Sequence, residues 1–413
     1  MFKVVEAFSG IGSQSKALKN IGLEHEIIAT IDWDINAIIA YDIIHNGQPN
    51  LSMCNELSIE QIRDELKNYT LSSDGKIPLT KAQIEKLPVS VAKHLFVAIK
   101  RSKNLVSITD IKGSQLEKNI DLLTYSFPCQ DLSIARAWHG ENGGIDRNAK
   151  NKSGMLWEIE RILKEREEAN IPLPKFLLME NVTNILAPRH SKNFEEWKQS
   201  LESMGYYNYV YKLNSENFGV PQKRNRVYMV SVQCDSKKKE FIKNYIDKHS
   251  LSDQEYLKKI VFKKVNINDI LKFDYDNKIY KIEAEDNNPN DTPSRRKIYD
   301  NNIKIFNGEQ ILCKSIGTIT TKQDRHPNSG VIEFPLFKEG KSKYRYLTPR
   351  ECFLLMGFEE KDFQAILDNN FEYRKNHKFF ATNNLHKMAG NSIVVNVLEY
   401  IFKQIIYIDK YIL

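Results

Sequence analysis

Residues 3–13 read KVVEAFSGIGS, an apolar strand pattern that runs directly into a turn with two glycines. The β-branched and apolar residues over Lys3–Phe8 predict a strand, and Gly10 and Gly12 let the following backbone come close to a ligand. An amphipathic stretch that reaches about Ile21 predicts a helix after the turn. A strand, a glycine turn and a helix in this order are typical of the ligand-binding edge of a Rossmann-like α/β domain.

The alternation of strand and helix patterns continues to about residue 232. We expect further strands over residues 26–31, 120–125, 175–179, 207–213 and 226–232, and helices over residues 35–45, 153–169 and 193–204. This order predicts a parallel α/β sheet. Residues 55–104 form a polar insertion with helical patterning, in which we find no candidate chemistry.

A change of composition after Cys234 predicts a second domain, as expected for a chain of 413 residues. The sequence becomes rich in Lys, Asn and Asp, with short apolar runs and turn clusters. Further on, Thr348–Glu351 reads as a helix-capping box, Gly357 marks the end of that helix, and a last apolar helix begins around Ile393. We expect a catalytic and cofactor-binding domain over residues 1–234, completed by residues 381–413, and a smaller domain over residues 235–380.

Composition and charge narrow the class of protein. With 41% hydrophobic and 27% charged residues and no bilayer-length apolar stretch, we expect a folded cytoplasmic protein without a membrane partner. A net charge of +7 includes Lys and Arg clusters at residues 237–239, 258–259, 263–264 and 295–297, which favour a polyanionic partner. A solvated Lys-rich surface explains the charge alone equally well. Five scattered cysteines without zinc spacing predict neither disulfides nor a metal site.

The second strand ends at Asp32 and Trp33, about twenty residues after the glycine turn. A carboxylate at this position can accept hydrogen bonds from ribose hydroxyls, and the indole offers a flat apolar surface to adenine. The third glycine of a dinucleotide fingerprint is replaced by Ser15, so an adenosine without a pyrophosphate fits better than NAD. An ordinary tight turn is the alternative for this motif.

Three later segments place reactive side chains at strand ends. Residues 126–133, SFPCQDLS, put Cys129 after an apolar strand; Glu180 ends the next strand, and Arg224 and Arg226 lead into another. A free cysteine has a pKa of about 8.5, so a nucleophilic thiolate needs a polar setting. The carboxyl ends of parallel strands meet at one edge, where we expect thiol, carboxyl and guanidinium to gather. The other four cysteines are read as inert.

These blocks, in this order, resemble the cytosine C5 DNA methyltransferase family of bacterial restriction–modification systems. The resemblance covers most of residues 1–232 and 344–400, including the blocks Arg345–Cys352 and Gly390–Ser392. It implies a Rossmann-like S-adenosylmethionine-dependent methyltransferase domain with a smaller target-recognition domain. The implied activity is methyl transfer to C5 of a cytosine flipped out of a short specific sequence in double-stranded DNA, through a covalent Cys129–C6 intermediate, with S-adenosylhomocysteine as product.

The resemblance also assigns roles to residues. For the cofactor it implies Phe8, Gly10, Ile11, Gly12, Asp32, Trp33, Asp110, Ile111, Asn391 and Ser392. For catalysis it implies Cys129 as nucleophile, Glu180 at the cytosine ring nitrogen and amino group and Arg226 at its carbonyl, supported by Pro128, Gln130, Asn181 and Arg224. For DNA contacts we expect Gln222, Thr318, Thr320, Gln323 and Arg325, with sequence choice residing in residues 235–345. Glu6 and Ser13 depart from the usual Asp and Gly of the family, which bears on the exact turn conformation.

The reaction itself calls for such a set of residues. C5 of cytosine is a poor nucleophile while the ring is aromatic, so a thiolate must first add to C6, helped by an acid at N3 and a cation at O2. C6 lies inside the base stack, so the base must leave the duplex. The polar, glycine-containing loop from Trp138 to Gly144 is expected to be mobile and to close over the base.

Three alternatives stay open at this point. An RNA cytosine methyltransferase would use the same catalytic blocks, although the long basic insert after Cys234 favours DNA. An NAD(P)-dependent oxidoreductase would share the first strand and turn but gives Cys129, Glu180 and Arg226 no role. A catalytically idle DNA-binding protein is disfavoured by the intact catalytic set. We expect a monomer, with any cognate restriction endonuclease acting separately.

Overall fold

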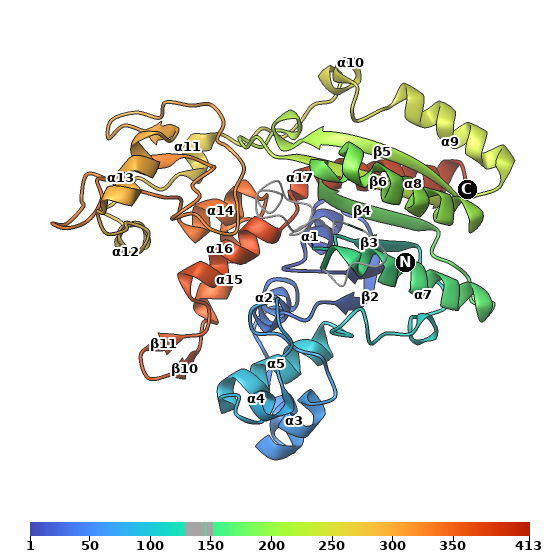
Figure 1. Cartoon of the computed structure of the whole chain (residues 1–413), viewed down its shortest axis with the longest axis horizontal. Coiled ribbons are helices and arrows are strands. Elements are labelled where there is room, and N and C mark those ends of the chain that lie inside the picture. The colour runs from blue at the N-terminus through green and yellow to red at the C-terminus, as the bar shows by residue number, and fades with distance from the viewer. Residues whose placement is uncertain (129–144, 146–151) are drawn as a thin grey trace. The chain divides into compact units, whose positions relative to one another are not determined.

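The computed structural model describes residues 1–128, 145 and 152–413 (Figure 1). The chain forms two compact units. Unit 1 comprises Met1–Leu213, Asn225–Ile260 and Leu398–Leu413, and unit 2 comprises Asn214–Arg224 and Val261–Val397.

These boundaries differ from the expected ones at both ends of the second domain. Helix α9 (Ser236–Lys248) groups with unit 1, where the ring of Tyr245 stacks on that of Tyr407 with centroids 4.4 Å apart. Helix α16 (Thr382–Asn391), which was expected in the first domain, groups with unit 2. The composition change at Cys234 therefore precedes the actual change of unit, because α9 is polar outside but packs through two buried isoleucines.

A six-stranded sheet forms the core of unit 1, in the order β2-β1-β3-β4-β6-β5. Its strands are β1 (Phe2–Ala7), β2 (His25–Ile31), β3 (Leu122–Tyr125), β4 (Phe176–Val182), β5 (Tyr206–Asn214) and β6 (Asn225–Gln233). The first four pair in parallel, as expected, but β6 runs antiparallel to β4. Residues 215–224 join β5 to β6 with only a 3-10 turn at Ser215–Phe218, too little chain for the helical crossover that a parallel neighbour needs.

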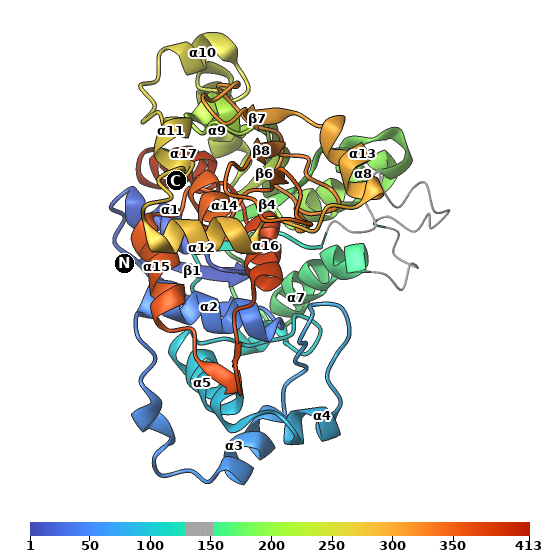
Figure 2. The same cartoon turned by 90° about the vertical axis from the view of Figure 1, so that its left-hand side faces the viewer.

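The helices of unit 1 are α1 (Ser13–Asn20), α2 (Ile35–Asn46), α3 (Ile59–Leu66), α4 (Lys81–Glu85), α5 (Val89–Arg101), α7 (Leu156–Glu168), α8 (Pro188–Ser203), α9, α10 (Gln254–Lys258) and most of α17 (Val395–Tyr411). Of these, α5 packs on α2, and α3 and α4 lie beside α5, away from the sheet (Figure 2). The apolar residues of the sheet are buried: Val5, Leu123, Leu177 and Met229 are at most 1% exposed. Among the helices of the described residues, none is both long and apolar enough to cross a membrane.

The insertion of residues 55–104 is helical, as expected, and it is bonded to the region where β2 ends at two points, one inside the insertion and one at its last residue. Ser72 pairs with Asp34, donating from its N to the Trp33 carbonyl oxygen at 2.8 Å. Asn104 pairs with Thr30. The insertion therefore buttresses the loop that follows β2.

Unit 2 is built from short elements. Its helices are α11 (Ile267–Ile270), α12 (Lys278–Asp286), α13 (Pro293–Asp300), α14 (Pro349–Leu355), α15 (Glu360–Asp368) and α16. Strands β7 (Lys304–Phe306), β8 (Val331–Glu333) and β9 (Tyr344–Arg345) form one sheet, and β10 (Glu372–Arg374) pairs with β11 (His377–Lys378). The expected capping box is confirmed: Thr348 Oγ1 accepts from Glu351 N at 3.2 Å, and a Glu351 carboxylate oxygen accepts from Thr348 N at 2.8 Å. Gly357, with φ of 89°, follows the end of α14 as expected.

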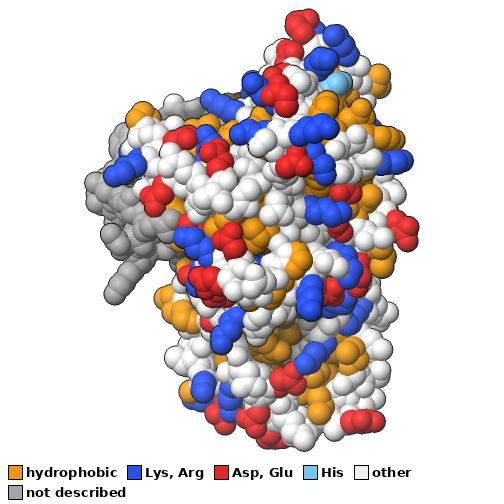
Figure 3. All heavy atoms as spheres, turned by 90° about the vertical axis from the view of Figure 1, so that its right-hand side faces the viewer, with side chains coloured by type: hydrophobic (Ala, Val, Ile, Leu, Met, Phe, Trp, Pro, Cys, Tyr) orange, Lys and Arg blue, Asp and Glu red, His pale blue; other side chains and the backbone are white. Residues whose placement is uncertain are grey.

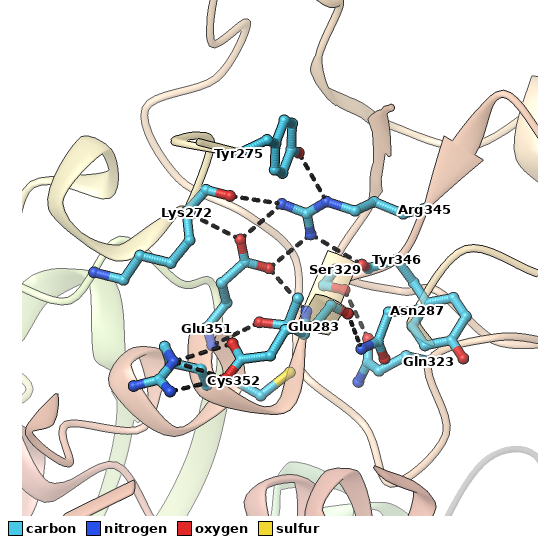
Figure 4. Close-up of polar contacts among 12 residues, drawn as sticks. Lys272, Tyr275, Glu283, Asn287, Gln323, Ser329, Arg345, Tyr346, Glu351 and Cys352 are labelled. Carbon is cyan, nitrogen blue, oxygen red and sulfur yellow. Dashed lines mark hydrogen bonds and ion pairs between the residues drawn. The ribbon is translucent and has the colours of Figure 1, made fainter. Parts of the chain in front are cut away.

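A buried ion pair joins β9 to α14 (Figure 4). The Arg345 guanidinium donates to both carboxylate oxygens of Glu351 at 2.9 Å, and neither side chain is exposed to solvent. Arg345 Nε also donates to the Tyr275 hydroxyl at 3.2 Å, and the backbone N of Lys272 donates to Glu351 at 2.9 Å. The conspicuous RYLTPRE sequence thus serves the internal architecture of unit 2.

Candidate active site

The ends of β3 and β4 and the start of β6 meet at one edge of the sheet. In the register, Tyr125 lies beside Met179, and Val182 lies opposite Arg226. Because β6 is antiparallel to β4, its first residues lie at the carboxyl end of β4. The reversal of β6 therefore brings Arg226 to the edge that carries Glu180.

Glu180 is held at this edge by two side chains from neighbouring segments. Its Oε1 lies 3.2 Å from Arg226 Nε, and its Oε2 accepts a hydrogen bond from Ser126 Oγ at 2.6 Å. The Glu180 side chain is 8% exposed and that of Arg226 is 16% exposed. A carboxylate and a guanidinium that are largely desolvated but still reachable have the setting of a binding or catalytic site.

Asn181 fixes the segment that leads to the expected nucleophile. Its Nδ2 donates to the Phe127 carbonyl oxygen at 3.1 Å, and its Oδ1 accepts from Val182 N at 2.8 Å. Pro128 is half-buried and is the last described residue of this segment. Cys129 and Gln130, and the loop from Trp138 to Gly144 that we expect to close over the base, lie outside the described residues.

The four other cysteines are poor candidates for a nucleophile. Burial raises the pKa of each of their thiols, which disfavours the thiolate: Cys54, Cys234, Cys313 and Cys352. Cys352 lies 3.7 Å from His386 Nδ1, and His386 in turn contacts Asn287 at 2.8 Å. Burial lowers the pKa of His386 to about 3, so this contact provides no base for Cys352 near neutral pH.

The glycine turn after β1 is closed by Asp32. Gly10 N donates to Asp32 Oδ2 at 2.8 Å, while Asp34 N donates to Asp32 Oδ1 at 2.9 Å. A Cβ on Gly12, which has φ of 77°, would stand 2.2 Å from His45 Nε2, so the close packing of α2 requires glycine there. At Gly10 no described atom lies within 4 Å of a Cβ position, and the turn presents open backbone.

The other residues expected at the cofactor are placed as follows. Phe8 adopts φ of 55°, unusual for a residue with a side chain, and packs partly buried against the core, whereas Ile11 is 2% exposed. Trp33 is half-buried beside Asp32, and Asp110 is exposed. Ile111 is 4% exposed and belongs to the hydrophobic core of unit 1.

Arg224 and Gln222 lie inside unit 2, where they join the segment before β6 to the rest of the unit. Arg224 donates to the carbonyl oxygens of Ile319, Gly390 and Ser392 at 2.8 to 3.0 Å. Gln222 is fully buried: its Nε2 donates to the Leu355 carbonyl oxygen at 2.9 Å, and its Oε1 accepts from Ile319 N at 3.0 Å.

That Gln222 and Arg224 hold unit 2 together was not predicted from the sequence, because polar residues next to an expected catalytic strand are typical of a functional site. Asn391 is exposed at the end of α16, whereas Ser392 is buried.

The residues expected to read DNA bases differ in availability. Gln323 is 2% exposed, and its Oε1 accepts from Ser329 Oγ at 2.9 Å (Figure 4). Its Nε2 donates to the Thr320 carbonyl oxygen at 2.7 Å, so both polar ends are engaged inside the unit. Thr318 and Thr320 use their hydroxyls on nearby backbone oxygens. The Arg325 side chain is 48% exposed, with its Nε 3.8 Å from Asp324. Arg325 is the most available of these residues.

Several expected phosphate contacts are engaged within the protein. Lys238 Nζ donates to the Leu413 carbonyl oxygen at 2.8 Å, and Lys239 lies over the ring of Tyr207 at 5.5 Å. Arg295 pairs with Asp324 at 2.6 Å and Arg296 pairs with a second aspartate at 2.7 Å. On the face drawn in Figure 3, basic and acidic side chains are interspersed and form no single basic stripe.

Solved structures define the fold class. The chain is similar to the S. pombe Dnmt2 methyltransferase, with a TM-score of 0.59 and 16% identity over the whole of both chains. It is also similar to the Entamoeba histolytica methyltransferase EhMeth, with a TM-score of 0.54 and 15% identity over 99% of this chain and 98% of that one. The expected fold is confirmed: unit 1 has the mixed α/β sheet of an S-adenosylmethionine-dependent methyltransferase.

Sequence comparisons then give the family. The model of the C-5 cytosine-specific DNA methylases matches residues 78–407. The chain is 36% identical over 408 residues to the orphan methyltransferase M.SssI of Spiroplasma monobiae, covering 98% of this chain and 97% of the relative. It is 32% identical over 408 residues to the type II methyltransferase M2.ScrFI of Lactococcus lactis subsp. cremoris, covering 98% and 99%. The chain belongs to the C-5 cytosine-specific DNA methylase family.

Membership confirms the expected class of enzyme, a DNA (cytosine-5) methyltransferase. The family implies DNA as the substrate and S-adenosylmethionine as the methyl donor. Among the described residues, no group of three or more His, Cys, Asp or Glu side chains is arranged to hold a metal ion.

Proposed function

We propose that the enzyme methylates C5 of a cytosine flipped out of double-stranded DNA, within a short specific sequence, through a covalent bond between Cys129 and C6. One observation carries the proposal: Glu180 is held between Ser126 and Arg226 at the strand edge, and the chain reaches Cys129 three residues after Ser126. Acid and cation therefore meet at the carboxyl end of β4, and Cys129 follows in the sequence of the adjoining segment. This is the set that activation of C5 demands.

Each residue has a defined part in the proposed reaction. The Cys129 thiolate adds to C6 and forms a carbon–sulfur bond, while Glu180 protonates or hydrogen-bonds N3 and Arg226 stabilises the charge at O2. The electron pair of the former C5–C6 double bond makes C5 nucleophilic, and C5 takes the methyl group as the bond from methyl to sulfonium sulfur breaks and S-adenosylhomocysteine is left. Solvent takes the C5 proton, and departure of the Cys129 thiolate then restores the aromatic ring.

The turn after β1 has features that fit the methyl donor. Asp32 fixes Gly10 and remains half-buried, so its carboxylate can also accept ribose hydroxyls, with Trp33 beside it for adenine. The open backbone at Gly10 offers room for the methionine portion. When bound, S-adenosylmethionine supplies a methyl group made electrophilic by its sulfonium centre.

We further propose that unit 2 is the target-recognition domain and that its residue Arg325 contacts a base of the target DNA. Arg325 is exposed, and a guanidinium can donate two parallel hydrogen bonds to guanine. The enzyme acts as a monomer, and any cognate restriction endonuclease is a separate chain. Bisulfite sequencing of plasmid DNA from cells that express the protein identifies the methylated sequence.

A covalent-trapping experiment tests the proposal directly. With 5-fluorocytosine in the DNA the enzyme cannot eliminate fluorine, so the wild type should form a complex that survives denaturation. Cys129→Ala should form none while still binding S-adenosylhomocysteine and DNA. Cys313→Ala, at a thiol whose pKa burial raises, is the matched control and should form the complex in full. Equal yields from wild type and Cys129→Ala would show that another residue is the nucleophile.

A further inference from the structure

Ser126 contacts the Glu180 carboxylate, although none of the expected roles includes it. It follows β3 directly, and its Oγ lies 2.6 Å from Glu180 Oε2, a distance typical of a strong hydrogen bond to a charged oxygen. The other carboxylate oxygen faces Arg226 Nε at 3.2 Å. Each oxygen of Glu180 therefore has its own partner, on opposite neighbouring strands.

The main chain around Ser126 is fixed on both sides. Before it, the Tyr125 hydroxyl accepts from Trp197 Nε1 at 3.1 Å, and both rings are buried. After it, the Phe127 carbonyl oxygen accepts from Asn181 at 3.1 Å. A hydroxyl on such a fixed segment can hold a neighbouring group in one orientation.

Glu180 needs this second partner to have a defined orientation. The terminal torsion of a glutamate is broad, so an ion pair at one oxygen leaves the plane of the carboxylate free to turn. A carboxyl group that must meet a ring nitrogen and an amino group of one base has to present both oxygens in the plane of that base. A small misplacement at such a point is costly in rate.

We propose that Ser126 is a positioning residue for methyl transfer, whose hydroxyl fixes the plane of the Glu180 carboxylate against the target cytosine. The inference rests on the proposed function, in which Glu180 contacts the base. Ser126 itself touches neither the reacting carbon nor the methyl donor in this scheme. Its loss should therefore slow the chemical step and leave the binding of both substrates intact.

Single-turnover methyl transfer with radiolabelled S-adenosylmethionine and plasmid DNA measures this effect. Ser126→Ala should slow the step about tenfold to a hundredfold, the range that corresponds to a hydrogen bond to a charged group. The KM for DNA and the calorimetric affinity for S-adenosylhomocysteine should stay at wild-type values. Ser126→Thr keeps the hydroxyl and should restore the rate to within about threefold of wild type.

A double-mutant cycle shows whether Ser126 acts through Glu180. In the Glu180→Gln background, Ser126→Ala should cost less than about threefold, because the carboxylate that it orients is gone. Ser200→Ala is the matched control, since Ser200 on α8 donates to buried Glu160 on α7 at 2.5 Å and loses the same kind of hydrogen bond. It should methylate at the wild-type rate.

The outcomes separate the two claims. A wild-type rate for Glu180→Gln would overturn the role of Glu180 and with it the proposed function. If Glu180→Gln is impaired, three results would overturn the positioning role of Ser126 alone. They are a fully active Ser126→Ala, additive effects in the double variant, and an equal loss of rate in Ser200→Ala.

Discussion

Two glutamate–arginine pairs in this chain have the same chemistry and different surroundings. Arg345 and Glu351 in unit 2 are completely buried, whereas the Arg226 and Glu180 side chains in unit 1 are 16% and 8% exposed. The buried guanidinium donates to the Glu351 carboxylate, a tyrosine hydroxyl and backbone oxygens. In contrast, Arg226 donates to Glu180 and to its neighbour's carbonyl oxygen, and its Nη2 has no partner among the described residues.

The difference shows how the same residue pair serves structure in one place and chemistry in another. A pair whose hydrogen-bonding groups are all used inside the protein can only hold the fold together. A pair with unused donors at a strand edge can accept a ligand without breaking what holds it. Exposure and free hydrogen-bonding capacity, more than residue type, separate the two.

The largest effect should come from the partly exposed pair, Glu180 and Arg226, and should be a loss of activity. Glu180→Gln removes the acid but keeps the shape, so the methylation rate should drop about 10²- to 10⁴-fold, the usual contribution of general acid–base catalysis. The free energy of unfolding should change by less than about 1 kcal/mol. Single-turnover kinetics and urea denaturation measure both. A large loss of stability with wild-type activity per folded molecule would show that Glu180 and Arg226 serve the fold and not the chemistry.

The buried pair should respond in the opposite way. Arg345→Met leaves the Glu351 charge buried without its cation, which should cost about 3–5 kcal/mol in the unfolding of unit 2. Adding Glu351→Gln removes that charge and should recover part of the loss. Urea denaturation of the single and double variants measures this. If the double variant is less stable than Arg345→Met, the ion pair contributes in some other way than by neutralising a buried charge.

Glu6 extends the comparison, because it is buried and no arginine of the described residues pairs with it. Desolvation raises its pKa from 4.5 to about 7, although Ser15, Tyr41 and Lys19 favour the anion. The folded state thus prefers the protonated form, so this contribution to stability is present below pH 4.5 and is lost as pH rises to about 7. The loss is up to about 3 kcal/mol.

Glu6→Gln should flatten the fall in stability between pH 5 and pH 8, as thermal unfolding in matched buffers measures. Burial lowers the pKa of His45 from 6.5 to about 3, so the His45 contribution raises stability as pH rises towards 6.5, opposite in sign to that of Glu6. It is the same in the wild type and in Glu6→Gln, so the difference between the two proteins reports Glu6 alone. An unchanged pH dependence in Glu6→Gln would place the titration on another group.

The smallest effect is expected at Arg325, which is half exposed and weakly paired. Arg325→Ala should relax the choice of base at one position of the target by about 1–3 kcal/mol and leave stability unchanged. Bisulfite sequencing of methylated plasmid libraries reads the preference. Arg295→Ala is the control, because Arg295 is closely paired with the same Asp324 and should affect stability instead. A relaxed target in Arg295→Ala but not in Arg325→Ala would exchange the two roles.

Local signals in the sequence predicted most of the elements of unit 1 and the capping box that begins α14 in unit 2. The glycine turn, the strand and helix patterns and the capping box at Thr348 depend on residues close together in the chain, and the structure has them within a few residues of the expected positions. The gathering of Glu180 and Arg226 was also predicted, but from a parallel sheet. The true reason, the reversed β6, depends on a loop length whose meaning is clear only once strand order is known.

Burial of polar residues could not be predicted in this way. Gln222, Arg224 and Gln323 sit in a part of the sequence full of candidate DNA contacts, yet each satisfies its side chain with backbone groups far along the chain or across a turn. Those partners come together only in the folded unit. Polar composition alone cannot distinguish a side chain that contacts DNA from one that forms hydrogen bonds with backbone groups inside the folded unit.

The way residues 55–104 are attached has a consequence for protein engineering. Ser72 makes backbone bonds to Trp33 and Ile35, and the residues on either side of Asn104 make backbone bonds to Thr30, so a deletion that removes either set would release the segment that carries Asp32. Exposed residues 76–78 lie between these two tether points. A reporter domain inserted there should leave the backbone bonds at both attachment points intact, so residues 76–78 are a suitable site for fusions of the enzyme.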